Sequence, residues 1–272
     1  MLLKTVYRYA HSIERRFFLL YDYFLQAARG KRLGAGIIAN ILRNPSVSED
    51  FVNLLCFLDP KNNIFLIDVG ANVGDFTADF IECFPNTKAI LFEPASTNYA
   101  FLEKRFKDNS SIKLVHCALS SECSERELWI GPKSTLHSLE RYTEEANISY
   151  DMCYDSVERV QVQTLDQFSL DLIGQTVVLK IDVQGHEVEM LKGSVSTLDS
   201  VDVCIIECSF ADEYEGKEPS FSAVTCLLRE YSLYPIIFQD IGRATSNYGF
   251  ERDIIFVKRN LLNRVFFLNY GS

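Results

Sequence analysis

From about residue 61 onward, short apolar segments alternate with segments whose apolar residues recur at helical spacing. VVLKI (177–181) and VCII (203–206) are nearly continuous apolar runs, which is typical of strands that are covered on both faces of a sheet. Regular alternation of such strands with helices indicates parallel pairing, because parallel strands need a long crossover connection. We therefore expect an α/β domain with a mostly parallel sheet and helices on both faces.

The same pattern predicts where the elements lie. Strands are expected at residues 64–69, 88–93, 112–116, 176–182, 202–208, 234–239 and 253–258. Helices are expected at residues 75–83, 96–107, 187–192 and 220–230. Between residues 121 and 165 the alternation breaks, and RELWI (126–130) and ERVQVQTL (158–165) alternate with a period of two. This predicts an inserted antiparallel ribbon around a polar loop, which we expect to face the substrate.

The chain divides into three regions: a helical extension (1–60), the α/β domain (61–260) and a C-terminal tail (261–272). In the extension, an apolar stripe at helical spacing is accompanied by eight Lys and Arg residues within positions 1–45. One interpretation is a basic helix at residues 11–32 that makes peripheral contact with an anionic membrane. The alternatives are a helical cap that packs on the sheet and a contact in a homodimer, since an apolar stripe usually belongs to a core.

The composition narrows the class of protein. A net charge of −10 argues against binding to nucleic acid, because such proteins are normally basic. The eight cysteines are widely spaced and form no C-x-x-C pair, which indicates reduced thiols and a cytoplasmic location, with membrane contact only at the periphery. No uncharged apolar run approaches the roughly 18–20 residues that cross a membrane.

The segment FLIDVGANVGDF (65–76) predicts a strand, a glycine turn and the start of a helix. Gly70 and Gly74 allow a ligand to approach the backbone, but the spacing G-x-x-x-G differs from the dinucleotide fingerprint, with Asn72 in place of its middle glycine. Glu93 ends the next strand, where a carboxylate binds ribose hydroxyls of either NAD or S-adenosylmethionine. Asp68 favours the ammonium and sulfonium groups of S-adenosylmethionine and would repel a pyrophosphate. The alternative is a tight turn in which backbone N–H groups satisfy Asp68.

A second dense cluster is VVLKIDVQGHEVEMLKG (177–193), in which a strand delivers Asp182 to the same edge of the sheet. His186 is expected at a helix N-terminus, where the helix dipole keeps imidazole neutral. A neutral imidazole suits a general base for O-methylation, and Asp182 could orient that base, take the proton or bind a cation. The alternative is structural: Asp182 caps the turn and His186 begins the helix.

Further polar residues accompany this cluster. Lys180 lies within an apolar strand and therefore needs a partner. Glu207 ends the following strand as another carboxylate aimed at the crevice, or else as the partner of Lys180. His116 is expected to pack or to lie near adenine, and His137 either meets substrate or is solvated in the inserted loop. No set of residues has the spacing of a structural zinc site.

The motifs FLIDVGANVGDF, LFEPASTN, HCALS, VQTLD and VLKIDVQGHEVEMLKG resemble the FkbM family of S-adenosylmethionine-dependent methyltransferases over about residues 60–260. The resemblance implies a seven-stranded Rossmann-like sheet and O-methylation of hydroxyls, often on sugars. It also implies a cofactor site made by Asp68, Gly70, Asn72, Gly74 and Glu93, with Ala118 near adenine and Asp182 facing the acceptor.

The chain departs from the family pattern D-x-E-G-x-E at one position, where Gln184 replaces the first glutamate and Glu187 retains the second. If that glutamate acts as a base or metal ligand in relatives, the task passes here to Asp182, His186 or Glu207. The involvement of a divalent metal is left open.

Three hypotheses of function result. The first is methyl transfer from S-adenosylmethionine to a hydroxyl of a sugar, glycan or glycosylated small molecule. The second is an NAD(P)-dependent oxidoreductase, which fits Glu93 but is disfavoured by Asp68 and the missing glycine. The third is a non-catalytic cofactor-binding protein of the same fold, to which Gln184 in place of a carboxylate points.

Overall fold

The computed structural model describes residues 58–59, 61–149, 151, 154–238 and 251–262. The expectations for the helical extension, apart from residues 58 and 59, and for the tail beyond residue 262 lie outside these residues. Within the described ranges, no helix combines the length and the apolar character that would let it cross a membrane.

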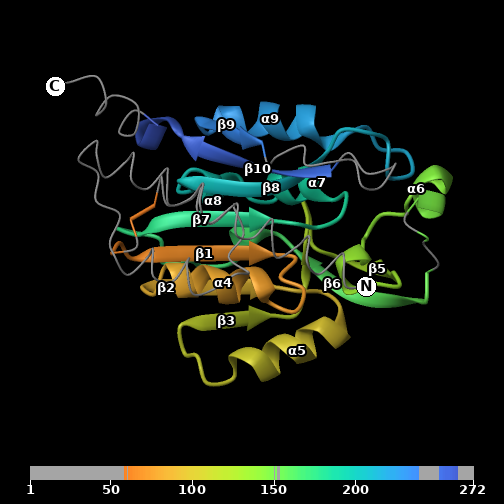
Figure 1. Cartoon of the computed structure of the whole chain (residues 1–272), viewed down its shortest axis with the longest axis horizontal. Coiled ribbons are helices and arrows are strands. Elements are labelled where there is room, and N and C mark those ends of the chain that lie inside the picture. The colour runs from red at the N-terminus through yellow and green to blue at the C-terminus, as the bar shows by residue number, and fades with distance from the viewer. Residues whose placement is uncertain (1–57, 60, 150, 152–153, 239–250, 263–272) are drawn as a thin grey trace, which may run out of the picture. The chain divides into compact units, whose positions relative to one another are not determined.

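A seven-stranded sheet forms the centre of the domain, in the order β3-β2-β1-β7-β8-β10-β9 (Figure 1). The strands are β1 (Ile64–Val69), β2 (Thr87–Phe92), β3 (Ile112–Val115), β7 (Thr176–Ile181), β8 (Val203–Ser209), β9 (Leu233–Phe238) and β10 (Glu251–Lys258). Strands β3, β2, β1, β7 and β8 pair in parallel, whereas β10 is antiparallel to both of its neighbours. The predicted mostly parallel, Rossmann-like sheet is confirmed. The first and last residues of all seven strands lie within two residues of the positions expected from the sequence.

The four predicted helices are confirmed as α4 (Asp75–Cys83), α5 (Ser96–Phe106), α7 (Glu187–Lys192) and α9 (Ser220–Glu230). Successive side chains of a strand point to opposite faces of the sheet, and in β7 (Thr176–Ile181) the side chains on both faces are buried. Leu179 and Ile181 belong to a core cluster with Met190 of α7 and Leu228 of α9, while Val178 on the other face is also fully buried. The short helices α6 (Glu144–Ser149) and α8 (Val195–Leu198) were not predicted from the sequence.

The predicted ribbon is present as a separate three-stranded sheet in the order β4-β6-β5. Its strands are β4 (Ala118–Leu119), β5 (Ser124–Ile130) and β6 (Ser156–Gln163), and β5 and β6 are antiparallel. Leu128 and Val160 lie in its small apolar core. Figure 1 shows this sheet beyond the carboxyl ends of β1 and β7, so the insertion lies at the edge where α/β proteins bind ligands.

Candidate active site

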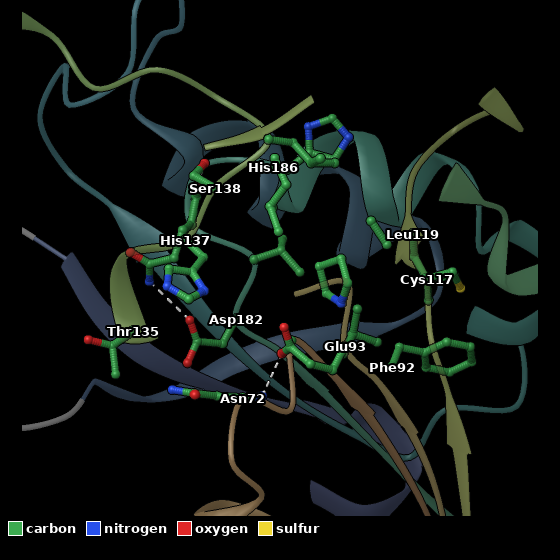
Figure 2. A pocket seen from close by; sticks show the side chains of 18 of the residues that line it. Asn72, Phe92, Glu93, Cys117, Leu119, Thr135, His137, Ser138, Asp182 and His186 are labelled. Atoms are coloured by element: carbon green, nitrogen blue, oxygen red, sulfur yellow. Dashed lines mark hydrogen bonds between the residues drawn. The ribbon is translucent and has the colours of Figure 1, made fainter. Parts of the chain in front are cut away.

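A pocket opens at the carboxyl ends of β1, β2 and β7, and we call it the strand-end pocket (Figure 2). Its lining comes from the large sheet and from the insertion, and comprises Val69, Gly70, Asn72, Phe92, Glu93, Pro94, Cys117, Ala118, Leu119, Leu128, Ser134, Thr135, His137, Ser138, Leu139, Asp182, Val183, Gln184 and His186. The insertion therefore helps to form the pocket.

The glycine turn brings the backbone of β1 against that of β7. Gly70 has a φ of +77°, and a Cβ atom there would lie 1.8 Å from the carbonyl oxygen of Asp182. The Gly70 and Ala71 amides both donate to the carbonyl of Phe92 at 3.0 Å, which ties the turn to β2. Only glycine fits this crossing, and the turn presents Asn72 to the pocket. Gly74 caps α4 and does not line the pocket.

Asp68 lies beneath the turn and does not line the strand-end pocket. Its side chain is fully buried, and Oδ2 accepts a hydrogen bond of 2.5 Å from the Thr77 hydroxyl. Burial raises the pKa of this carboxyl, although Lys180 and Thr77 act in the opposite direction. Oδ1 has no hydrogen-bond partner in the described part of the chain. A hydroxyl and a nearby lysine stabilise Asp68, rather than the backbone N–H groups considered from the sequence.

Glu93 lies inside the pocket at the end of β2 and is 4% exposed. One carboxylate oxygen accepts a hydrogen bond of 2.7 Å from the backbone amide of Asn72 (Figure 2), and the other accepts one of 2.9 Å from the backbone amide of Ala95. Burial raises the pKa of Glu93 to about 7, despite the opposing effect of these bonds. Close by, the Asn72 side-chain oxygen is buried and without a partner among the described residues. This end of the pocket therefore offers hydrogen-bond acceptors.

Asp182 lies at the other side of the pocket, and 37% of its side chain is exposed. Lys180 donates to its Oδ2 at 2.9 Å, and Gln184 Nε2 donates to its Oδ1 at 3.0 Å. Burial by itself would raise the pKa of Asp182, but the Lys180 ion pair and the hydrogen bonds hold it below its usual value. Asp182 is therefore ionised near neutral pH while its carboxylate remains accessible.

Lys180 has Asp182 as its partner, so the alternative pairing with Glu207 is wrong. Its ammonium group is almost fully buried and does not reach the pocket, and it lies 5.6 Å from the centre of the Phe76 ring. Glu207 accepts a hydrogen bond of 2.6 Å from Gln184 Nε2 and lies behind the pocket lining. Burial, together with the neighbouring carboxylates, raises the pKa of Glu207 well above its usual value.

His186 precedes the first residue of α7 and is 1% exposed. Its Nδ1 lies 2.5 Å from a Glu140 carboxylate oxygen, and its Nε2 lies 2.9 Å from the Ser120 hydroxyl. Burial is the main cause that lowers the pKa of His186, whereas the sequence analysis attributed the same direction to the helix dipole. Because both ring nitrogens have protein partners, this geometry favours a positioning function over direct contact with an acceptor hydroxyl.

His137 also lines the pocket, and it lies on the insertion. It is half-buried among the lining residues of the insertion, so a fully solvated loop position is wrong for it. Burial lowers its pKa and favours the neutral ring, and its Nδ1 lies 3.4 Å from the Asn98 side-chain nitrogen. His116 instead stacks on Tyr99 outside the pocket lining, with 4.4 Å between the ring centres.

The sequence of the chain matches a known protein family. The model of the methyltransferase FkbM domain matches residues 68–233, which include the glycine turn, Glu93, the insertion and Asp182. The chain belongs to the FkbM methyltransferase family. Membership of this family of S-adenosylmethionine-dependent methyltransferases implies S-adenosylmethionine as the cofactor of this FkbM-family protein.

Two curated relatives are similar to part of the chain. Methyltransferase sdnD from Sordaria araneosa is 27% identical over 161 residues, which cover 48% of this chain and 61% of that protein. Methyltransferase 1 from Beauveria bassiana is 22% identical over 177 residues, covering 57% of this chain and 71% of that protein. The match with sdnD thus spans less than two thirds of that relative's length.

Solved structures show similarity at lower sequence identity. FkbM methyltransferase from Methylobacillus flagellatus is 14% identical with a TM-score of 0.47, covering 73% of this chain and 44% of that chain. Fibrillarin from Aeropyrum pernix, solved with S-adenosyl-L-methionine, is 9% identical with a TM-score of 0.42, covering 75% of this chain and 74% of that chain.

The residues present fit S-adenosylmethionine. Glu93 and the unpartnered oxygen of Asn72 offer acceptors to hydroxyl or ammonium groups, and no Lys or Arg among the lining residues could bind a pyrophosphate. Cys117, Ala118 and Leu119 provide an apolar wall of the kind that an adenine ring requires. Gly70, Asn72, Glu93 and Ala118 would therefore hold the cofactor.

The raised pKa of Glu93 predicts that cofactor affinity depends on pH. Below about pH 7 the carboxyl is protonated, and hydroxyl groups bind best to the ionised form, so binding releases a proton. Affinity for S-adenosylhomocysteine should rise about tenfold per pH unit between pH 5 and pH 7 and then level off. Calorimetric titration across this range measures the slope.

Glu93→Gln is the matched control for that experiment. It keeps the size of the side chain and removes the titrating group, so affinity should be lower and nearly independent of pH. Glu187, whose pKa is also raised to about 7 by burial, is present in both proteins. An equal pH slope in Glu93→Gln would contradict the assignment to Glu93.

Proposed function

We propose that this FkbM-family protein transfers the methyl group of S-adenosylmethionine to a hydroxyl of a sugar, a glycan or a glycosylated small molecule. The observation that carries the proposal is a single pocket with a ribose-type acceptor, Glu93, on one side and an ionised, accessible Asp182 on the other. The insertion adds the hydroxyl groups of Ser134 and Thr135 to the lining, which suits an acceptor rich in hydroxyls.

The residues of the chain act mainly by binding and orientation. When bound, S-adenosylmethionine supplies an electrophilic methyl group on a sulfonium. Glu93 accepts hydrogen bonds from the ribose hydroxyls, and the Asn72 side-chain oxygen accepts one from a neighbouring donor. Fixing the two reactants in one pocket accelerates a displacement because their relative freedom is already lost on binding.

Asp182 accepts a hydrogen bond from the acceptor hydroxyl and then takes its proton on a carboxylate oxygen. Its low pKa makes it a weak base, but the hydroxyl becomes strongly acidic only as its oxygen bonds to the methyl group. Lys180 keeps Asp182 ionised until that point. His137, neutral and in the same pocket, provides a second hydrogen-bonding group for the acceptor.

His186 acts through its neighbours rather than on the acceptor directly. Its contacts with Ser120 and Glu140 connect the insertion to the start of α7, immediately after the loop that carries Asp182. Glu140 is also paired with Lys217 at 2.9 Å, and the contacts with His186 and Lys217 lower its pKa to about 2 although burial acts in the opposite direction. The ionised Glu140 thereby orients the imidazole and the polar loop of the insertion.

Calorimetric titration of the purified protein with S-adenosylhomocysteine, NAD and NADP tests the proposal. Saturable binding of S-adenosylhomocysteine alone is the expected result, and hydroxylated glycans are then screened for incorporation of a labelled methyl group. Binding of NAD in place of S-adenosylhomocysteine would identify an oxidoreductase, and binding of none of the three would favour a non-catalytic protein.

A further inference from the structure

Gln184 occupies an unusual place between two carboxyl groups. Its single side-chain nitrogen donates to Asp182 Oδ1 at 3.0 Å and to Glu207 Oε2 at 2.6 Å. The amide nitrogen therefore links Asp182 and Glu207 into one cluster of three side chains. The two N–H groups of one amide thus hold together two groups that would repel each other if both were ionised.

The rest of the structure holds this amide in one orientation. The Tyr142 hydroxyl donates to Gln184 Oε1 at 2.8 Å, and the Ser138 hydroxyl donates to the Gln184 backbone carbonyl. Gln184 is 8% exposed and has a φ of +50°, a conformation that side-chain-bearing residues adopt only when their surroundings impose it. Because the carbonyl oxygen is engaged by Tyr142, the amide nitrogen must face the carboxyl groups.

The distances in this cluster are those of ligands around a small divalent cation. Oxygen atoms at 2.0–2.1 Å from an octahedral Mg²⁺ lie about 3 Å from their neighbours. The Gln184 amide nitrogen lies within 3.0 Å of one oxygen from each carboxyl group, so a carboxylate oxygen in its place would complete a three-carboxylate set. Among the described residues, no set of three or more His, Cys, Asp or Glu side chains is arranged to hold a metal.

We propose that the Gln184 amide replaces a divalent cation between Asp182 and Glu207, so that Asp182 is positioned for methyl transfer without a metal. Gln184 is a positioning residue, and its effect on turnover rests on the proposed function. Lys180 neutralises the other oxygen of Asp182, which leaves one shared point between the two carboxyl groups to be occupied by an amide, a proton or a cation.

Gln184→Glu tests the proposal through metal binding as well as activity. The variant should gain a site for Mn²⁺, and saturating Mn²⁺ should raise its melting temperature by about 4 °C or more. The wild-type protein should shift by less than about 1 °C. Methyl transfer should be unaffected by a chelator in the wild type, and in the variant it should fall at least about tenfold and recover with Mn²⁺.

Two further variants isolate the cause. Gln161→Glu also places a new acid beside a glutamate, since Gln161 Nε2 contacts Glu125 at 3.3 Å, but it is exposed on β6 and should gain no Mn²⁺ response. Gln184→Glu combined with Glu207→Gln returns one amide to the cluster and should restore activity without metal. This swap separates the position of the amide from a general loss of structure.

A wild-type protein that needs a divalent cation for transfer would overturn the proposal. A Gln184→Glu variant without any Mn²⁺-dependent change in melting temperature would do so as well. Failure of the proposed function would appear separately, as absence of S-adenosylhomocysteine binding by the wild type. The Mn²⁺-dependent change in melting temperature of the variant could still be interpreted in that case.

Discussion

Replacement of Asp182 by asparagine is expected to lower the turnover number by about 10²- to 10⁴-fold, the range attributed to a positioned proton acceptor. Asparagine has nearly the same size and retains a carbonyl oxygen for Lys180, so the loss comes from the missing negative charge on the group that the acceptor hydroxyl contacts. Steady-state methyl-transfer assays on wild type and variant measure the change, once an acceptor is found.

Cofactor binding is the control for this variant. S-adenosylhomocysteine affinity should change by less than about threefold, because Glu93 and Asn72 are untouched and Asp182 acts on the acceptor. Asp108→Asn, on the exposed loop after α5, should leave both turnover and affinity unchanged. Full turnover by the Asp182→Asn protein would show that another group accepts the proton, and His137 would be the first residue to test.

Gly70→Ala is expected to have the largest effect on both stability and binding. The new methyl group would lie 1.8 Å from the Asp182 carbonyl oxygen, and the residue would have to keep a φ of +77°. The ends of β1 and β7 must then move apart, which shifts Asn72 and the whole cofactor end of the pocket. We expect the free energy of unfolding to fall by about 3 kcal/mol or more and S-adenosylhomocysteine binding to be lost.

Urea denaturation and calorimetric titration measure these two effects, and Gly174→Ala is the matched control. Gly174 has a φ of +72°, but no atom lies within 4 Å of a Cβ placed there. That variant reports the cost of the backbone conformation alone, about 1–2 kcal/mol, with binding retained. If the two variants were equally stable, the close contact between β1 and β7 would not be what requires glycine.

The sequence predicted the large sheet well because its signals are local. Continuous apolar strands, glycine turns and helical periodicity fix where elements begin and end, and strand ends fix which residues meet at the ligand edge. Gly70, Glu93 and Asp182 were therefore expected at this edge, the family resemblance added Asn72 and Ala118, and all five lie in the pocket lining. The antiparallel direction of β10 could not be predicted in this way, because the apolar pattern of a strand is the same whether it runs parallel or antiparallel to its neighbour.

The parts of the site that the sequence did not reveal depend on contacts between distant segments. Glu140 and Ser120 are separated from His186 by 46 and 66 residues, and no local pattern marks them as its partners. For His137 the sequence left both substrate contact and a solvated position open, because the irregular insertion has no period from which the direction of its side chain could be inferred. Asp68 ends up under the turn since the alternation along β1 turns it towards Thr77 and Lys180 rather than the pocket.

The attachment of the insertion to the loop after β7 has a consequence for redesign. Ser138 and Tyr142 form hydrogen bonds with Gln184, and Glu140 contacts His186. These three residues of the insertion lie within one stretch of five residues, 138–142. A chimaera that imports the β5–β6 loop of a relative to alter acceptor choice would therefore also release the residues that support Asp182. We expect grafts that retain these three residues, and vary only the hydroxyl-bearing residues around Ser134 and Thr135, to leave the surroundings of Asp182 intact while changing which acceptor the pocket takes.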